Sequence, residues 1–132
     1  MSALADRLSG YASIVEIGIG NRTALARKLA ADGTSVTATD IQQRETPPDV
    51  QFVLDDVTEP TTEVYADAEA LVACNLPPEL HAPAARLAER VEADFLFTTL
   101  GGDPPTVPVR RETLTGETLF VYCGNPSRNV LE

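Results

Sequence analysis

The stretch Val15-Glu16-Ile17-Gly18-Ile19-Gly20 decides how this chain is organised. It joins an apolar run, residues 13–17, to two glycines one residue apart, and a helical pattern follows over residues 22–31. Glycines at this spacing let the backbone turn tightly and let a ligand approach without a Cβ in the way. The helix after the turn presents free N–H groups and the positive end of its dipole. The stretch therefore predicts a strand, a turn and a helix, with a ligand site at the turn.

The rest of the chain repeats this alternation of strand and helix. Further strands are predicted at residues 36–39, 50–54, 70–74 and 94–100, and further helices at residues 4–11 and 80–91, while residues 61–68 fit either a short helix or a turn. Such alternation predicts a parallel sheet covered by helices. After a loop at residues 101–105, the runs 107–114 and 117–122 flank Thr115-Gly116 and predict a β-hairpin.

Right-handed crossovers place the carboxyl ends of parallel strands along one rim of the sheet. Ligands of open α/β sheets bind on that rim, where the strand order reverses. Asp40 closes the second predicted strand twenty residues after Gly20, at a position where a carboxylate can accept hydrogen bonds from ribose hydroxyls. The predicted rim consists of Gly18 to Thr23, Asp40-Ile41, Asp55-Asp56, Asn75-Leu76 and Gly101-Gly102.

Composition and charge exclude several classes of protein. A length of 132 residues fits one domain, and a hydrophobic fraction of 43% is too high for a disordered chain. No apolar run reaches the roughly 18 residues of a membrane helix, and the N-terminus lacks a secretion signal, so we expect a soluble, cytoplasmic protein. The net charge of −10 repels phosphate backbones and anionic lipid, which disfavours nucleic acid as a partner.

The types of charged residue are as informative as the balance between acidic and basic ones. Twenty acidic residues stand against ten basic ones, and Lys28 is the single lysine. This pattern resembles halophilic proteins from salt-saturated cytoplasm, in which carboxylates hold hydration and salt screens their repulsion. An acidic protein from dilute cytoplasm is the alternative. In the first case the surface acids reflect the solvent and not a partner.

Metal and thiol chemistry find little support in the sequence. Cys74 and Cys123 lie in apolar runs without the spacing of metal ligands, and we expect them to be buried, reduced thiols. With one histidine in the chain, no zinc or other metal site is predicted. That histidine, His81, is expected to be a solvated side chain at a helix start, with a general base as the alternative.

Glu16-x-Gly18-x-Gly20 followed by Asp40 resembles the first two motifs of class I S-adenosylmethionine-dependent methyltransferases. The resemblance implies a Rossmann-like fold and S-adenosylmethionine as the cofactor. In that family the acid before the glycines orients the methionine end of the cofactor, the second acid takes the ribose, and an acid after the third strand lies near adenine. The cofactor-binding residues implied are Glu16, Gly18, Gly20, Asn21, Asp40, Ile41, Asp55 and Asp56.

Asn75-Leu76-Pro77-Pro78 resembles the Asn-Pro-Pro-aromatic motif of amino-group methyltransferases, with a leucine inserted and Glu79 in place of the aromatic residue. The resemblance implies a catalytic role for Asn75, which would hold the target amine. The alternative is that Pro77-Pro78 only starts the next helix. Asn21-Arg22 also replaces the usual third glycine.

The whole chain resembles an uncharacterised archaeal family of small Rossmann-like proteins related to these methyltransferases. We therefore predict one three-layer α/β domain over residues 1–132, with a nucleotide-binding core over residues 1–100 and a loop and C-terminal β-hairpin over residues 101–132. The sheet is predicted to be mostly parallel and truncated, because the chain lacks room for the seven strands and the lid of the larger enzymes.

Three functions follow from these residues. The leading one is an S-adenosylmethionine-binding, methyltransferase-like protein whose substrate is open. Gly18-x-Gly20-x-x-Thr23 with Asp40 also fits an NAD-binding fingerprint, although Thr23 crowds the helix against the strand. The third is a non-catalytic module for nucleotide sensing or assembly, in which the hairpin pairs edge to edge in a homodimer.

Overall fold

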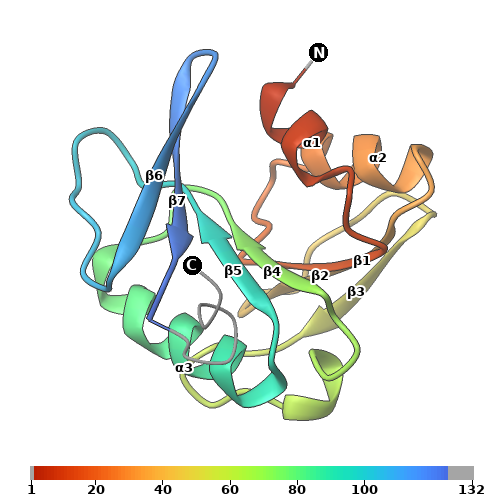
Figure 1. Ribbon diagram of the computed structural model, residues 1–132. Coiled ribbons are helices and arrows are strands. Elements are labelled where there is room, and N and C mark those ends of the chain that lie inside the picture. The colour runs from red at the N-terminus through yellow and green to blue at the C-terminus, as the bar shows by residue number, and fades with distance from the viewer. Residues whose placement is uncertain (1, 125–132) are drawn as a thin grey trace.

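The computed structural model describes residues 2–124, which form a single seven-stranded sheet (Figure 1). The strand order is β3-β2-β1-β4-β5-β7-β6. The first five of these strands run parallel, β7 runs antiparallel to β5, and β6 runs antiparallel to β7. The strands are β1 (Ser13–Ile17), β2 (Ser35–Asp40), β3 (Val50–Leu54), β4 (Ala70–Ala73), β5 (Asp94–Phe97), β6 (Val109–Leu114) and β7 (Glu117–Tyr122).

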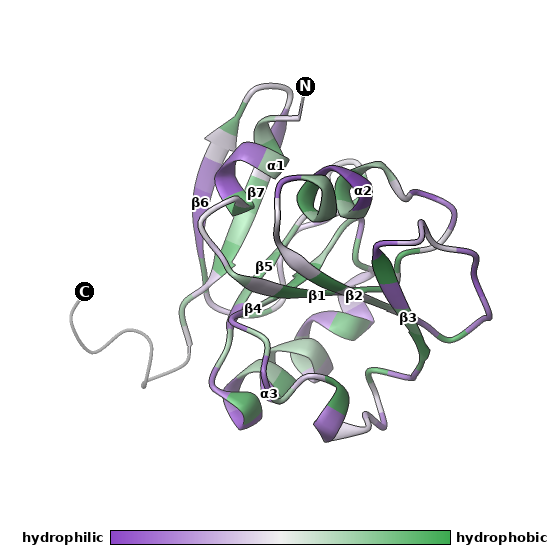
Figure 2. Cartoon of the chain, turned by 90° about the vertical axis from the view of Figure 1, so that its right-hand side faces the viewer, coloured by the Kyte–Doolittle hydropathy of each residue, from purple (hydrophilic) through white to green (hydrophobic). Residues whose placement is uncertain are grey.

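Three α-helices cover the sheet from both sides. Figure 2 shows α1 (Ala3–Leu8) and α2 (Ala24–Ala31) on one face and α3 (His81–Val91) on the other. Two short 3₁₀ helices, η1 (Thr62–Val64) and η2 (Pro78–Leu80), complete the described helical structure, so residues 61–68 contain a short helix followed by a turn. The three-layer, mostly parallel α/β architecture predicted from the sequence is confirmed. No described helix is long and apolar enough to cross a membrane.

Alternation along β1 distributes its side chains between two hydrophobic cores. Ile14 belongs to the core under α1 and α2, while Val15 and Ile17 belong to the core under α3. Successive residues of a strand point to opposite faces, so Glu16 points to the same face as Ile14. A carboxyl group is thereby directed into the α1–α2 side of the molecule.

The hairpin corrects the prediction that the chain is too short for seven strands. It supplies the last two strands of the sheet, because Leu96 of β5 pairs with Val121 of β7, and Phe97 pairs with Phe120. What is reduced is the helical cover, since no described helix separates β2 from β3 or β5 from β6. β5 ends at Phe97, three residues before its predicted end, and β4 ends at Ala73, one residue before its predicted end.

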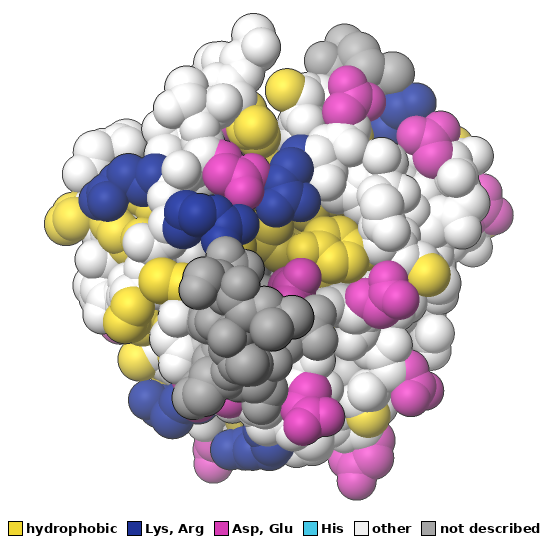
Figure 3. All heavy atoms as spheres, viewed as in Figure 1, with side chains coloured by type: hydrophobic (Ala, Val, Ile, Leu, Met, Phe, Trp, Pro, Cys, Tyr) yellow, Lys and Arg dark blue, Asp and Glu magenta, His cyan; other side chains and the backbone are white. Residues whose placement is uncertain are grey.

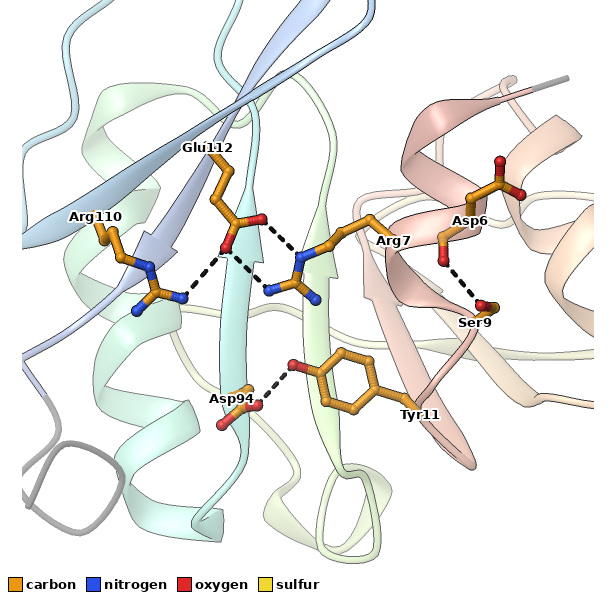
Figure 4. A network of polar contacts seen from close by, with 7 residues as sticks. All are labelled: Asp6, Arg7, Ser9, Tyr11, Asp94, Arg110 and Glu112. Carbon is orange, nitrogen blue, oxygen red and sulfur yellow. Dashed lines mark hydrogen bonds and ion pairs between the residues drawn. The ribbon is translucent and has the colours of Figure 1, made fainter. Parts of the chain in front are cut away.

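Polar contacts tie α1 to strands far away in the sequence (Figure 4). Arg7 donates through Nε and Nη2 to the two carboxylate oxygens of Glu112 in β6, at 2.6 and 3.1 Å. Glu112 also accepts a hydrogen bond from Arg110, and these bonds lower the pKa of its carboxyl group. The Tyr11 hydroxyl donates to Asp94 at 2.6 Å. The N-terminal helix and the hairpin are thereby joined across one face of the sheet.

The hairpin is an integral part of the fold, and a substitution in it tests this. Leu119 of β7 is 0% exposed and packs in the core under α1 and α2. We expect Leu119→Ala to lower the free energy of unfolding of the whole domain by about 2–4 kcal/mol, through lost burial and the cavity left behind. Thr113→Ala on the exposed side of β6 is the control, expected within about 0.5 kcal/mol of the wild type. Chemical denaturation followed by circular dichroism measures both, and an unchanged midpoint for Leu119→Ala would show that the hairpin is dispensable.

Candidate functional site

The turn after β1 adopts a backbone that requires glycine. Gly18 and Gly20 have φ angles of +69° and +57°, in the left-handed region that other residues rarely occupy. The amides of Gly18 and Ile19 both donate to the carbonyl of Thr39, at 2.8 and 3.1 Å. A Cβ built at either glycine meets no atom within 4 Å, so the space beside the turn is open.

Asp40 fixes this turn from the end of β2. Its Oδ2 accepts a hydrogen bond from the Gly20 amide at 2.8 Å, and its Oδ1 accepts one from the Gln42 amide at 3.0 Å. The carboxylate is 8% exposed and also pairs with Arg44, whose Nε lies 3.5 Å from Oδ2. The two elements that the sequence placed together, the glycine turn and Asp40, are therefore in direct contact.

A cavity of about 810 Å³ opens beside the glycine turn. It lies between the turn, the first residues of α1 and α2, the end of β4 and the start of β7. Of the predicted cofactor-binding residues, four line it, together with the predicted catalytic residue; these five are Glu16, Gly18, Gly20, Asn21 and Asn75. This cavity is the candidate site.

Glu16 is the buried acid of the candidate site, in contrast to the exposed Glu117. It is 4% exposed, and its Oε1 has no hydrogen-bond partner among the described residues. Burial disfavours the charged form and raises the pKa of Glu16 to about 8. The neighbouring Cys74 thiol is affected in the same direction, and its pKa rises to about 12, mainly through burial and secondarily through the charge of Glu16. The cavity therefore contains a carboxyl group that lacks the partner that burial demands.

Asn75 lies where this cavity meets a second one. The second cavity, of about 610 Å³, lies toward the loop after β5 and shares Asn75, Thr98 and Glu117 with the first. Asn75 has a φ angle of +54°, uncommon for a residue with a side chain, and its amide donates to the Thr98 hydroxyl at 2.9 Å. Asn75 therefore has an unusual backbone conformation at the junction of the two cavities. Its catalytic role stays a prediction.

His81 corrects one expectation from the sequence. It is 0% exposed instead of solvated, and its ring lies 4.6 Å from that of Phe97, centroid to centroid. The Thr106 amide donates to Nδ1, so Nδ1 accepts, and Nε2 carries the proton that it donates to the Leu76 carbonyl at 3.0 Å. With both nitrogens committed, His81 anchors the segment after β4. The inserted Leu76 is buried beside it, a structural reason that the sequence did not reveal.

Like Asp40, the three remaining predicted cofactor-binding residues lie outside the lining of the cavity. Asp55 lies beside Asp40, and its backbone amide donates to the Asp40 carbonyl at 3.0 Å. The Asp55 carboxylate accepts hydrogen bonds from the Tyr65 hydroxyl, at 2.6 Å, and from the Thr61 amide. Asp56 accepts from the amide and hydroxyl of Thr58, which lowers its pKa. Ile41 is 68% exposed. All three lie at the carboxyl ends of β2 and β3, and their proposed contacts with adenosine stay predictions.

The charge of the cavity is mixed, which the sequence showed only in part. Arg22 and Lys28 line it as well as Glu16 and Glu117, although Lys28 is paired with Asp32 at 3.1 Å. Acidic side chains are spread over the face seen in Figure 3 and do not gather into one patch. No group of three or more metal-binding side chains occurs within residues 2–124. The cavity can therefore hold a ligand with charges of both signs.

The unpartnered Glu16 makes the stability of the domain depend on pH. The folded protein binds this proton more tightly than the unfolded chain, whose pKa is near 4.5, so the stabilisation is full below pH 4.5 and is lost as the pH rises through 8. Glu16→Gln cannot ionise. We expect its stability to rise relative to that of the wild type by on the order of 3 kcal/mol between about pH 5 and pH 8. Urea unfolding at about pH 5 and pH 8 measures the free energy of unfolding of both proteins, and the exposed Glu59→Gln is the control. If the stability of Glu16→Gln and of the wild type changed in parallel with pH, Glu16 would not be buried without a partner.

The fold is shared with solved methyltransferases. A TehB-like SAM-dependent methyltransferase from Corynebacterium glutamicum matches 90% of this chain and 84% of its own length, with a TM-score of 0.61 and 16% sequence identity. An RNA methyltransferase from Salinibacter ruber, solved in complex with S-adenosyl-L-homocysteine, matches the same shares with a TM-score of 0.59 and 16% identity. At these identities the likeness concerns the fold.

Relatives by sequence cover most of the chain. A UPF0146 protein from Halobacterium salinarum is 45% identical over 119 residues, which are 89% of this chain and 92% of the relative. A UPF0146 protein from Archaeoglobus fulgidus is 40% identical over 90 residues, which are 68% of this chain and 69% of the relative. The model of the uncharacterised protein family UPF0146 matches residues 1–124. The chain therefore belongs to the UPF0146 family of archaeal proteins, and the solved structures that share its fold include methyltransferases.

Proposed function

We propose that this protein binds S-adenosylmethionine in the cavity beside the glycine turn and is a methyltransferase-like protein. The observation that carries the proposal is Glu16, a buried carboxyl group with an unpartnered oxygen at the wall of that cavity. Desolvation of such a group is offset by a cationic donor. The ammonium group of an amino acid is a donor of this kind.

The other groups of the cavity fit the same ligand. The amino acid end of S-adenosylmethionine carries an ammonium and a carboxylate, and the cavity offers Glu16 to the first and Arg22 to the second. The glycine turn leaves open space beside Gly18 and Gly20 for the part of the ligand between its amino acid end and its nucleoside end. A volume of about 810 Å³ is within the usual range of ligand pockets.

The residues of this chain would act mainly by positioning. S-adenosylmethionine brings an activated methyl group, so the protein has to align the acceptor with it and exclude water. Glu16 holds the amine, and Asp40 keeps the glycine turn in place through the Gly20 amide. Asn75 lines both cavities and, in this proposal, would contact an acceptor that enters from the second cavity.

Isothermal titration of the full chain with S-adenosylmethionine and S-adenosylhomocysteine tests the proposal. We expect binding in about 2 M and about 0.2 M KCl, because the contacts lie in a buried site that salt screens weakly. Glu16→Gln should weaken binding at least about tenfold, since it removes the charge that faces the ammonium. Glu59→Gln, an exposed change outside the cavity, should leave binding unchanged.

Two ligands serve as controls for this experiment. 5′-Methylthioadenosine lacks the amino acid end, so its weaker binding should be insensitive to Glu16→Gln. NADH tests the dinucleotide alternative, and tighter binding of NADH than of S-adenosylhomocysteine would favour it. Absence of any binding of S-adenosylmethionine and S-adenosylhomocysteine at millimolar concentration would refute the proposal and favour a non-catalytic assembly module.

Ligand binding should also displace the proton of Glu16. Because burial raises the pKa of Glu16 to about 8, the empty protein carries this proton at neutral pH, and an ammonium group favours its release. We expect affinity for S-adenosylhomocysteine to rise between about pH 5.5 and pH 7.5, by at most about tenfold per pH unit. Titrations in buffers of different ionisation enthalpy measure the released proton directly. The same heat of binding in all buffers would place the ligand away from Glu16.

A further inference from the structure

Two buried polar side-chain atoms have no hydrogen-bond partner among the described residues, and both belong to residues near the glycine turn. One is Oε1 of Glu16, and the other is Nε of Arg44. Buried donors and acceptors without a partner are rare in folded proteins, and each calls for an explanation. The Glu16 atom belongs to a residue of the cavity wall, while the Arg44 atom lies next to Asp40, outside the lining of the cavity. A ligand that crosses the turn can satisfy both.

Arg44 is held close to the turn by a different part of its guanidinium group. Its Nη1 donates to Oδ1 of Asn21 at 3.1 Å, and Asn21 lines the cavity. Its Nε lies 3.5 Å from Oδ2 of Asp40, a distance that supports an ion pair but is too long for a hydrogen bond. The side chain is therefore held near the turn, while its buried Nε–H has no hydrogen-bond partner among the described residues.

Asp40 also has capacity left. A carboxylate offers about four lone-pair positions, and the amides of Gly20 and Gln42 occupy two of them. A group that contacts both residues has to accept a hydrogen bond from Arg44 and donate one to Asp40. A phosphate or carboxylate cannot donate and is repelled by Asp40, and an ammonium cannot accept and is repelled by Arg44. A hydroxyl does both through a single oxygen, which can lie about 2.8 Å from each atom.

We propose that Arg44 is a ligand-binding residue that, together with Asp40, recognises a ribose hydroxyl and makes the site selective for ribonucleosides. This inference rests on the proposed function, because it places the nucleoside end of that ligand at the turn. Asn21 acts as a positioning residue by fixing the guanidinium through Nη1. The loop between β2 and β3, in which no helix is described, thereby provides a contact that neither the glycine motif nor Asp40 indicates.

Competitive binding of adenosine, 2′-deoxyadenosine and 3′-deoxyadenosine to the full chain tests the inference. We expect the wild type to bind adenosine at least about tenfold more tightly than the weaker of the two deoxy analogues. This ratio corresponds to the loss of one hydrogen bond to a charged group. Arg44→Met should reduce this ratio to about one to three and leave the affinity for that analogue within about twofold. Arg44→Lys, which keeps the charge but loses the planar fork, should give an intermediate ratio.

The controls separate this inference from the proposed function. Arg90→Met, an exposed change on α3 at the opposite face of the sheet, should keep the wild-type ratio. Thermal unfolding of each variant shows that it is folded. An unchanged ratio of adenosine to deoxyadenosine affinity in Arg44→Met, or tighter binding of all three nucleosides by this variant, would overturn the role of Arg44. If the protein still binds S-adenosylhomocysteine in that case, the proposed function is unaffected. Absence of binding of every nucleoside and of S-adenosylhomocysteine to the wild type would overturn both.

Discussion

The hydrogen bond from the Gly20 amide to Asp40 is the contact on which the arrangement of the site depends. The turn after β1 needs two residues at positive φ, and a turn of this kind keeps one geometry only when its surroundings hold it. Asp40 does so from the end of β2, and the register of β1 against β2 determines that this carboxylate meets the turn. The sheet, the turn and the cavity are thus connected through this one carboxylate.

The fold was largely readable from local patterns. Apolar runs of four to six residues, separated by helical segments, suffice to predict parallel strands, and the hairpin turn at Thr115-Gly116 predicts the last two. The expected shortage of strands was wrong because a hairpin adds two strands without any crossover helix. Length limits the number of helices in this chain more than the number of strands.

The site was readable only where a backbone constraint dictates the residue. Gly18, Gly20 and Asp40 follow from the geometry of a strand-to-helix turn. Arg44 does not, because its partners Asn21 and Asp40 are brought to it by the path of a loop without a regular pattern. His81 shows the same limit, since its two partners come from segments on either side of it that only the tertiary fold brings together. Contacts of this kind leave no periodic signal in the sequence.

Glu16 supports the proposal that the site binds a ligand, because this residue does not favour the stability of the empty domain. A leucine or valine at this position of β1 would pack against the same neighbours without a desolvation cost, and the other side chains of β1 that point into the two cores are apolar. An ionisable side chain whose pKa is raised to about 8 weakens the empty domain at neutral pH. Proteins tolerate such a cost mainly at functional sites, where a partner removes it. The open space above the glycine turn, directly beside this carboxyl group, is where such a partner has room to bind.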